Sequence, residues 1–204
     1  MAETTQTTKA KKGIEKDFFE VKAPLTATKI LLYGGSVEDF NGKVVKLDLT
    51  RSLRGKSLEL KFRVKTEGDK LEGIPIQTLL VGSYIRRMMR RGVDYVEDSF
   101  ETECRDYIVR VKPFFITRRK VSRSIRNNLR LSSKKFLIGH LKTRNAEEIF
   151  GEIISNKLQR QLALKLKKIY PLALCEIRIF ETIKEIEKKK EEKRNKEEKE
   201  ENIG

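Results

Sequence analysis

The sequence predicts an α+β fold, in which an antiparallel, barrel-like sheet is followed by basic and amphipathic helices and by a returning strand. Three observations predict it. Apolar and polar residues alternate through much of the first half, apolar residues at helical spacing begin near Arg119, and alternation returns after Pro171. The expected segments are a flexible N-terminal tail (1–15), a β-rich domain (16–117), a helical segment with the returning strand packed on the sheet (118–182) and a low-complexity charged tail (183–204).

Strands are expected where short alternating or apolar runs end at turn residues. An alternating run buries one face and exposes the other, which is typical of antiparallel sheets. Pro24 ends the first run, and the Gly34-Gly35 pair ends the second. The runs are Phe18–Val21, Ile30–Tyr33, Val45–Leu49, Leu58–Val64 and Tyr107–Val111.

A short helix is expected at Ser83–Arg91, because Gly92 is well placed to end it. We expect its Met88 and Met89 to pack in the core. Its arginines form two i,i+4 pairs, and the planar guanidinium group suits paired contacts with phosphate. These candidate RNA-binding residues are Arg86, Arg87, Arg90 and Arg91.

Longer helices are expected in the second half. Val121, Ile125 and Leu129 recur every four residues, which predicts a helix that begins near Arg119. A second helix is predicted to begin with a capping box, in which a capping side chain and the side chain three residues later each bond the other's backbone N–H. The capping residues are Asn145 and Glu148.

The end of the helical segment is marked by a break and a proline. Ser155-Asn156 predicts a break, and helix resumes at Lys157–Lys168 until Pro171 stops it. The strand Leu172–Phe180 then pairs back with the sheet. Beyond it, Lys184–Glu201 holds eight basic and eight acidic residues, so the excess positive charge lies elsewhere.

The charge balance points to a polyanionic partner. Forty-six Lys and Arg against thirty Asp and Glu give a formal net charge of +16, and a polyanion would relieve the resulting repulsion. A membrane partner is not expected, since the longest uncharged stretch, Gly73–Ile85, is short of the about 20 apolar residues that a span requires. The N-terminus lacks the apolar core of a signal peptide. We therefore expect a cytoplasmic protein that binds nucleic acid.

Acidic residues are absent from a long window between Asp106 and Glu147. Its forty residues contain twelve Lys or Arg. Five of these cations, which we call the cationic row, have spacings that place them on one helix face, opposite the Val121, Ile125 and Leu129 stripe. The cationic row is Arg119, Arg123, Arg126, Arg130 and Lys134. A solvated basic face is the alternative interpretation, but the exclusion of acids favours nucleic acid. The candidate RNA-binding residues in this window are Arg118, Arg119, Lys120, Arg123, Arg126, Arg130, Lys134 and Lys135.

Two phenylalanines beside this window are further candidates for RNA contact. Phe114 and Phe115 precede Arg118 and could stack on unpaired bases. Neighbours on an extended segment point to opposite faces, so we expect one in the core and at most one free.

Neither catalysis nor a metal or cofactor site is expected. The sequence has no phosphate-binding glycine motif and no nucleophile motif. His140 is the single histidine, and we expect it to be solvated or to face RNA. Cys104 and Cys175 are expected to be reduced thiols, although a disulfide is an alternative.

An acidic run gives the enzymatic alternative. Glu97, Asp98 and Glu101 could hold Mg²⁺ for a nuclease. Alternation along a strand places some of these carboxylates on opposite faces, so an exposed strand edge is the favoured interpretation.

Several segments together carry a family resemblance. The opening Lys16–Pro24 resembles the K-D-W-Y-D-V-K-A-P opening of the archaeal and eukaryotic small-subunit ribosomal protein family called S-one-e or S-three-a-e, with Phe18-Phe19 in place of Trp-Tyr. Three further stretches agree with this family in order and spacing: Val44–Leu49, Asp106–Lys120 and Ile169–Leu172.

The resemblance implies a structural constituent of the small ribosomal subunit and not an enzyme. It implies a position on the platform of the subunit near the mRNA exit. The implied partners are small-subunit rRNA and other platform proteins, with mRNA as a further contact. The short chain looks more archaeal than eukaryotic. A free-standing RNA-binding translation or assembly factor that uses the same basic helix is the alternative.

Overall fold

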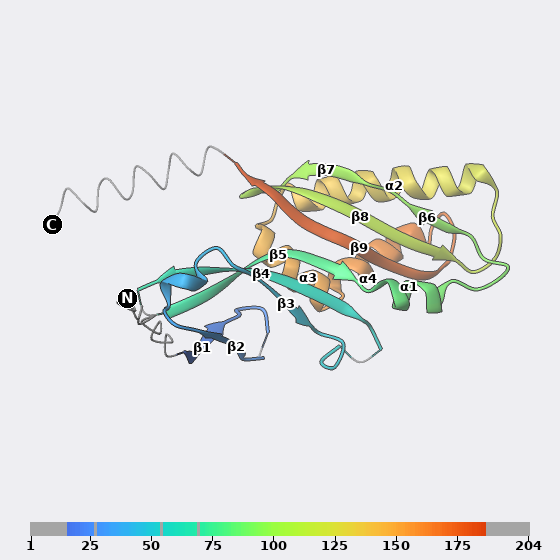
Figure 1. The fold of residues 1–204 in the computed structure, drawn as a ribbon. Coiled ribbons are helices and arrows are strands. Elements are labelled where there is room, and N and C mark those ends of the chain that lie inside the picture. The colour runs from blue at the N-terminus through green and yellow to red at the C-terminus, as the bar shows by residue number, and fades with distance from the viewer. Residues whose placement is uncertain (1–15, 27, 54, 69, 187–204) are drawn as a thin grey trace, which may run out of the picture. The chain divides into compact units, whose positions relative to one another are not determined.

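The computed structural model describes residues 16–26, 28–53, 55–68 and 70–186. The predicted N-terminal tail (1–15) therefore lies outside the described residues, and so does the predicted charged tail (183–204) except for 183–186, of which 183–185 belong to a strand instead of a tail. The described chain divides into two compact units (Figure 1). The first unit comprises the described residues of Met1–Lys43 and Val64–Ile74, and the second those of Val44–Arg63 and Pro75–Gly204. Strands β4 (Leu58–Glu67) and β5 (Lys70–Leu80) contribute residues to both.

The first unit is built on a hairpin of β1 (Asp17–Lys22) and β2 (Ile30–Gly34), followed by the 3-10 turn η1 (Glu38–Phe40). The hairpin is antiparallel, as its apolar runs predicted. β1 also pairs with the beginning of β5 in parallel, which the sequence did not indicate. Gly34 is required because a Cβ at this position would overlap the ring of Phe40.

The second unit contains most of the chain. Its elements in chain order are β3 (Val44–Asp48), α1 (Gly82–Met88), β6 (Tyr95–Glu97), β7 (Phe100–Glu103), β8 (Tyr107–Thr117), α2 (Arg123–Leu141), α3 (Ala146–Ile154), α4 (Lys157–Leu166) and β9 (Leu172–Glu185), with parts of β4 and β5.

Nine described strands share one hydrogen-bonded sheet. The main path runs β2-β1-β5-β9-β8-β6, β3 and β4 branch from β5, and β7 pairs with β8. Within the described residues the two end strands of this path, β2 and β6, do not pair with each other, so the sheet is not closed and the barrel-like prediction was wrong. Alternation of apolar and polar residues indicates that a strand has one buried face, but it does not indicate whether the two edge strands of a sheet pair with each other.

β8 and β9 form the centre of the second unit, where they run antiparallel over almost their whole length. In the view of Figure 1, α3 and α4 lie behind β9, and α2 lies along β6 and β7. Fully buried side chains fill the space between the layers, and Phe150 of α3 meets Phe180 of β9 edge-on at 4.8 Å between ring centroids. The returning strand was therefore predicted correctly, although it extends five residues beyond Phe180 to Glu185.

Helix boundaries differ from the predictions in ways that affect the charged residues. α1 ends at Met88, and the side chain of Met89 is 42% exposed instead of packed in the core. α2 begins at Arg123, because Ser122 caps it by accepting a hydrogen bond from the N–H of Ile125. Asn145 does occupy the cap position of α3, but its side chain makes no capping bond, so the capping box is not formed. The predicted break is present, with Asn156 in the left-handed region at φ 60°.

None of the helices in the described part of the chain has the length and apolar character needed to cross a membrane.

Candidate nucleic-acid interface

All twelve predicted RNA-binding cations are exposed. They lie in three places, which are α1 with the loop after it, the loop between β8 and α2, and α2 itself. Among the ion pairs between described residues, none includes any of the twelve. Their charge is therefore available to an anionic partner.

Asp94 brings two of these cationic segments together. Its backbone N–H donates to Thr117 Oγ1 at 3.0 Å, and its carbonyl accepts from the N–H of Thr117 at 2.9 Å. Its carboxylate accepts from the N–H of Val121 at 2.9 Å. Thr117 is fully buried, so the loop after α1 is fixed beside the loop that precedes α2. Cations from two distant stretches of sequence thus become neighbours.

The helix α4 and its C-cap residue add two cations that the sequence analysis missed. Arg160 and Lys167 line a hollow of about 430 Å³ together with Arg118 and the apolar residues around Pro171. A signal was present in the sequence. Residues 153–175 form a second acid-free window, and the seven-residue spacing of Arg160 and Lys167 places them on one helix face.

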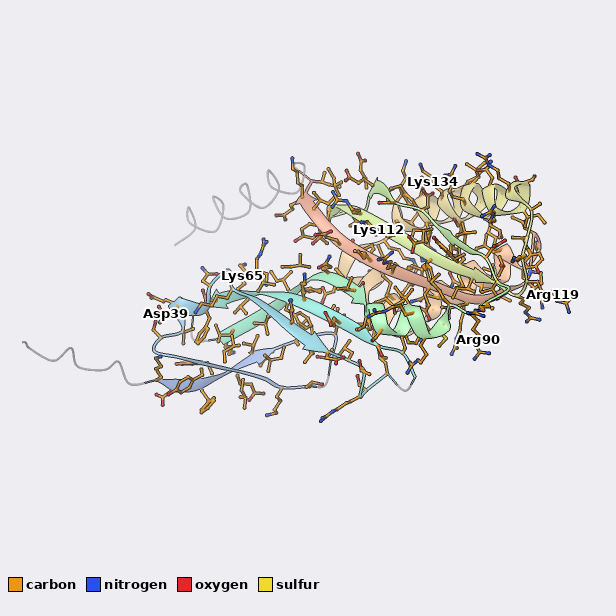
Figure 2. All side chains as sticks on the ribbon, turned by 45° about the vertical axis from the view of Figure 1, so that its right-hand side comes forward. Asp39, Lys65, Arg90, Lys112, Arg119 and Lys134 are labelled. Atoms are coloured by element: carbon orange, nitrogen blue, oxygen red, sulfur yellow. The ribbon has the colours of Figure 1, made fainter. Side chains whose placement is uncertain are left out.

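We call this cluster the basic end of the second unit. Figure 2 shows its Arg90 and Arg119 at the same end of that unit, whereas Lys134 lies farther along α2. The N-terminus of α2, where the helix dipole is positive, adds to the positive potential here. The basic end comprises Arg90, Arg91, Arg118, Arg119, Lys120, Arg123, Arg126, Arg160 and Lys167.

The cationic row on α2 differs in part from the prediction. Arg119 precedes the helix, whereas Arg123, Arg126 and Arg130 lie on it with Lys134. The buried positions of α2 are Leu129, Ser133, Leu137 and Leu141. At 100° per residue the row borders this stripe instead of lying opposite it. The predicted buried stripe was Val121, Ile125 and Leu129, of which Leu129 is fully buried and the other two are only half-buried.

The open face of the sheet is charged as well, but there the charges compensate one another. Arg110 lies 2.9 Å from Glu101 and 3.6 Å from Glu181, and Arg178 lies 2.8 Å from Glu97. Two of the three carboxylates of the nuclease alternative are therefore bonded to arginine. The described residues also contain no group of three or more His, Cys, Asp or Glu that could hold a metal ion.

Phe114 and Phe115 are both fully buried, which agrees with the expectation that at most one is free and leaves neither ring open to a base. The pairing of β8 with β9 shifts register between Lys112 and Pro113, and every residue from Pro113 to Thr117 is buried. The ring of Tyr95 lies 6.3 Å from that of Phe114. Tyr95, which is 52% exposed, is the aromatic residue that remains open beside the arginines.

His140 is packed between helices, not solvated or facing RNA as expected. Its ring stacks on Phe136 at 5.7 Å, and its Nε2 lies 2.8 Å from Glu152 Oε2 of α3. Glu152 also pairs with Arg144. Burial lowers the pKa of His140, and the nearby charge of Arg144 lowers it further. The side chain thus links α2 to α3.

Both cysteines are free thiols, Cys104 buried and Cys175 half-buried. Burial, with Asp106 nearby, raises the pKa of Cys104 to about 12, and burial also raises the pKa of Cys175. A thiol that stays protonated is a poor nucleophile and a poor metal ligand.

Comparison with known proteins finds similarity over most of the chain. The sequence model of the ribosomal S3Ae family matches residues 4–186. A small ribosomal subunit protein eS1 from Nanoarchaeum equitans is 27% identical over 175 residues, which cover 81% of this chain and 87% of the relative. A protein of the same name from Sulfurisphaera tokodaii is 29% identical over 181 residues, or 83% and 92% of the two chains. Another, from Methanothermobacter thermautotrophicus, is 29% identical over 136 residues, or 64% and 68%.

Proposed function

The chain belongs to the ribosomal S3Ae family, and from this premise we propose that it is a structural, non-enzymatic constituent of the small ribosomal subunit that docks on rRNA through its basic end. The observation that carries the proposal is the set of Asp94 hydrogen bonds that hold the loop after α1 beside the loop before α2. A folded protein with no anionic partner would gain nothing from collecting cations there, since like charges repel.

The mechanism is electrostatic and depends on shape. Arginine and lysine side chains contact phosphates and release the counterions condensed on RNA, which supplies most of the affinity. Such contacts fix the position and orientation of the protein without reading sequence. Because Asp94 and Thr117 hold the cations in a fixed arrangement, the basic end favours a particular path of the phosphate backbone, as in shape-selective recognition of RNA.

We place the protein on the platform of the subunit near the mRNA exit, in contact with other platform proteins and with mRNA as a further contact. Support for this finer placement is the resemblance of the Lys16–Pro24 opening and the Ile169–Leu172 stretch to that family. The cytoplasmic small subunit is the corresponding location.

Sedimentation in a salt gradient tests the proposal against a free-standing RNA-binding factor. An integral subunit protein remains with the small subunit after a wash in moderate salt, because it is held by many simultaneous phosphate contacts and by neighbouring proteins. A factor would be released. The measurement is the fraction of protein in the subunit peak before and after the wash, and release at a salt concentration that leaves other subunit proteins bound would contradict the proposal.

A further inference from the structure

A groove lies between β6 and the first turns of α2. It has a volume of about 740 Å³, which falls in the range of about 300–1,000 Å³ typical of small-ligand sites. Three arginines of the cationic row line it, together with Asn127 and Ser124 from α2 and Tyr95, Val96 and Glu97 from β6. The groove therefore combines an aromatic ring, cations and neutral polar groups.

Tyr95 is held as a platform on the β6 side of the groove. Its strand pairs with β8, where Tyr95 is opposite Ile116, and its ring lies 6.3 Å from the buried ring of Phe114. Half of the residue nevertheless remains exposed. A large exposed aromatic ring supported from behind by a core residue resembles the stacking platforms on which RNA-binding proteins place unpaired bases.

The opposite wall supplies the charge for a phosphate. Arg123, Arg126 and Arg130 lie on successive turns of α2 and are all exposed. Arg130 is oriented by a hydrogen bond of 3.2 Å from its guanidinium group to Asn127 Oδ1. The one carboxylate in the lining, Glu97, is 2.8 Å from the guanidinium group of Arg178, which offsets its repulsion of an anion.

We propose that this groove binds one unpaired nucleotide of RNA, with its base stacked on Tyr95 and its phosphate held by Arg123, Arg126 and Arg130. The proposal rests on the proposed function and adds to it a second type of contact. The basic end responds only to the path of the phosphates, whereas the groove requires a base that is free to leave a helix, because stacked and paired bases present no open face. The groove would therefore direct docking toward a bulge, loop or strand end.

The test compares two RNA probes of equal length, a perfect duplex and the same duplex with a single-nucleotide bulge, with binding measured by fluorescence anisotropy. Wild type should bind the bulged probe more tightly. Tyr95→Leu, which keeps an apolar side chain against Phe114, should weaken binding of the bulged probe about tenfold, in line with the cost of removing one stacked base. Tyr95→Phe keeps the ring and should bind both probes as wild type does.

Two further readouts separate this proposal from general RNA binding. Replacing the bulged base by 2-aminopurine should give quenched fluorescence on binding to wild type and Tyr95→Phe, but not to Tyr95→Leu. The slope of log affinity against log salt should be the same for Tyr95→Leu and wild type, since no phosphate contact is lost. Equal weakening of both probes by Tyr95→Leu, no weakening of either, or unquenched 2-aminopurine in the wild-type complex would overturn the groove assignment. If wild type bound neither probe, the proposed function itself would fail.

Discussion

Asp94 is an acidic residue whose removal should weaken binding to a polyanion. Its carboxylate bonds the N–H of Val121, and so fixes the loop that carries Arg118, Arg119 and Lys120. Charge counting alone predicts that Asp94→Ala binds RNA more tightly. We predict the opposite, a loss of about tenfold, comparable to the free energy of one charged hydrogen bond.

Asp94→Asn is the matched control, because its side-chain oxygen can still accept from Val121. It should bind RNA at least as tightly as wild type. Fluorescence-anisotropy titrations of wild type, Asp94→Ala and Asp94→Asn with one RNA duplex measure the three affinities. Tighter binding by Asp94→Ala would show that the loops keep their arrangement without this bond.

Breaking a buried ion pair in the second unit should lower stability without affecting RNA binding. Lys56 Nζ lies 2.6 Å from Glu176 and donates to Asn156 Oδ1 at 2.7 Å, and both charged side chains are almost fully covered. Lys56→Met leaves the Glu176 carboxylate buried without its partner, which should lower the free energy of unfolding by about 3–5 kcal/mol.

The double variant Lys56→Met with Glu176→Leu should recover most of that loss, because it removes both buried charges. Urea denaturation of wild type, both single variants and the double variant forms a thermodynamic cycle that measures the coupling. Additive effects would mean that the two side chains do not depend on each other.

At the scale of elements, α2 has two halves of different stability. Its buried residues begin at Leu129, so the first turns hold arginines without a buried contact of their own. At low salt the repulsion along this row is poorly screened, since the Debye length is about 30 Å at 0.01 M. We predict that amides of Asn127–Arg130 exchange with solvent faster than those of Leu137–Leu141 at low salt, and that salt or RNA slows them.

Hydrogen exchange resolved by residue measures this difference. The control carries Gln in place of Arg123, Arg126 and Arg130, and it should show slow exchange at low salt without RNA. Uniform protection along wild-type α2 at low salt would contradict the prediction.

The order of helices and strands was largely predictable from the sequence, and the wrong predictions concern features that depend on distant parts of the chain. Alternation and turn residues placed β1 to β4, β8 and β9, because these signals are local. Strands β6 and β7 are too short to show a period. Phe114 and Phe115 are both buried although neighbours on a strand point to opposite faces, so both faces of β8 are covered there, which alternation along one strand cannot indicate.

The candidate site was predictable as a charge pattern but not as an arrangement. The acid-free window identified the cations of α2 and the loop before it. No sequence signal indicated that Asp94 would hold that loop against the loop after α1, since these hydrogen bonds join residues more than twenty positions apart. His140 was misjudged for the same reason, because its partner Glu152 lies on the next helix.

At the scale of the whole molecule, the distribution of charge matters more than its sum. The formal net charge is +16, yet the open face of the sheet pairs its arginines with carboxylates, while the basic end does not enter the ion pairs between described residues. Two variants that lose the same number of positive charges from different regions should therefore differ in RNA binding.

The salt dependence of RNA affinity tests most directly whether the basic end is the docking surface. Arg119→Gln with Arg123→Gln removes two charges from it. The control, Arg105→Gln with Lys142→Gln, removes two exposed charges at the other end of α2, a helix of 19 residues and so about 28 Å long. Both variants lower the formal net charge from +16 by the same amount.

For the basic-end variant, the slope of log affinity against log salt should flatten by between about one and two, because each lost phosphate contact removes about 0.7–0.9. The control variant should keep the wild-type slope. Equal flattening in both variants would mean that net charge alone binds RNA, and flattening in the control alone would place the docking surface at the opposite end of α2.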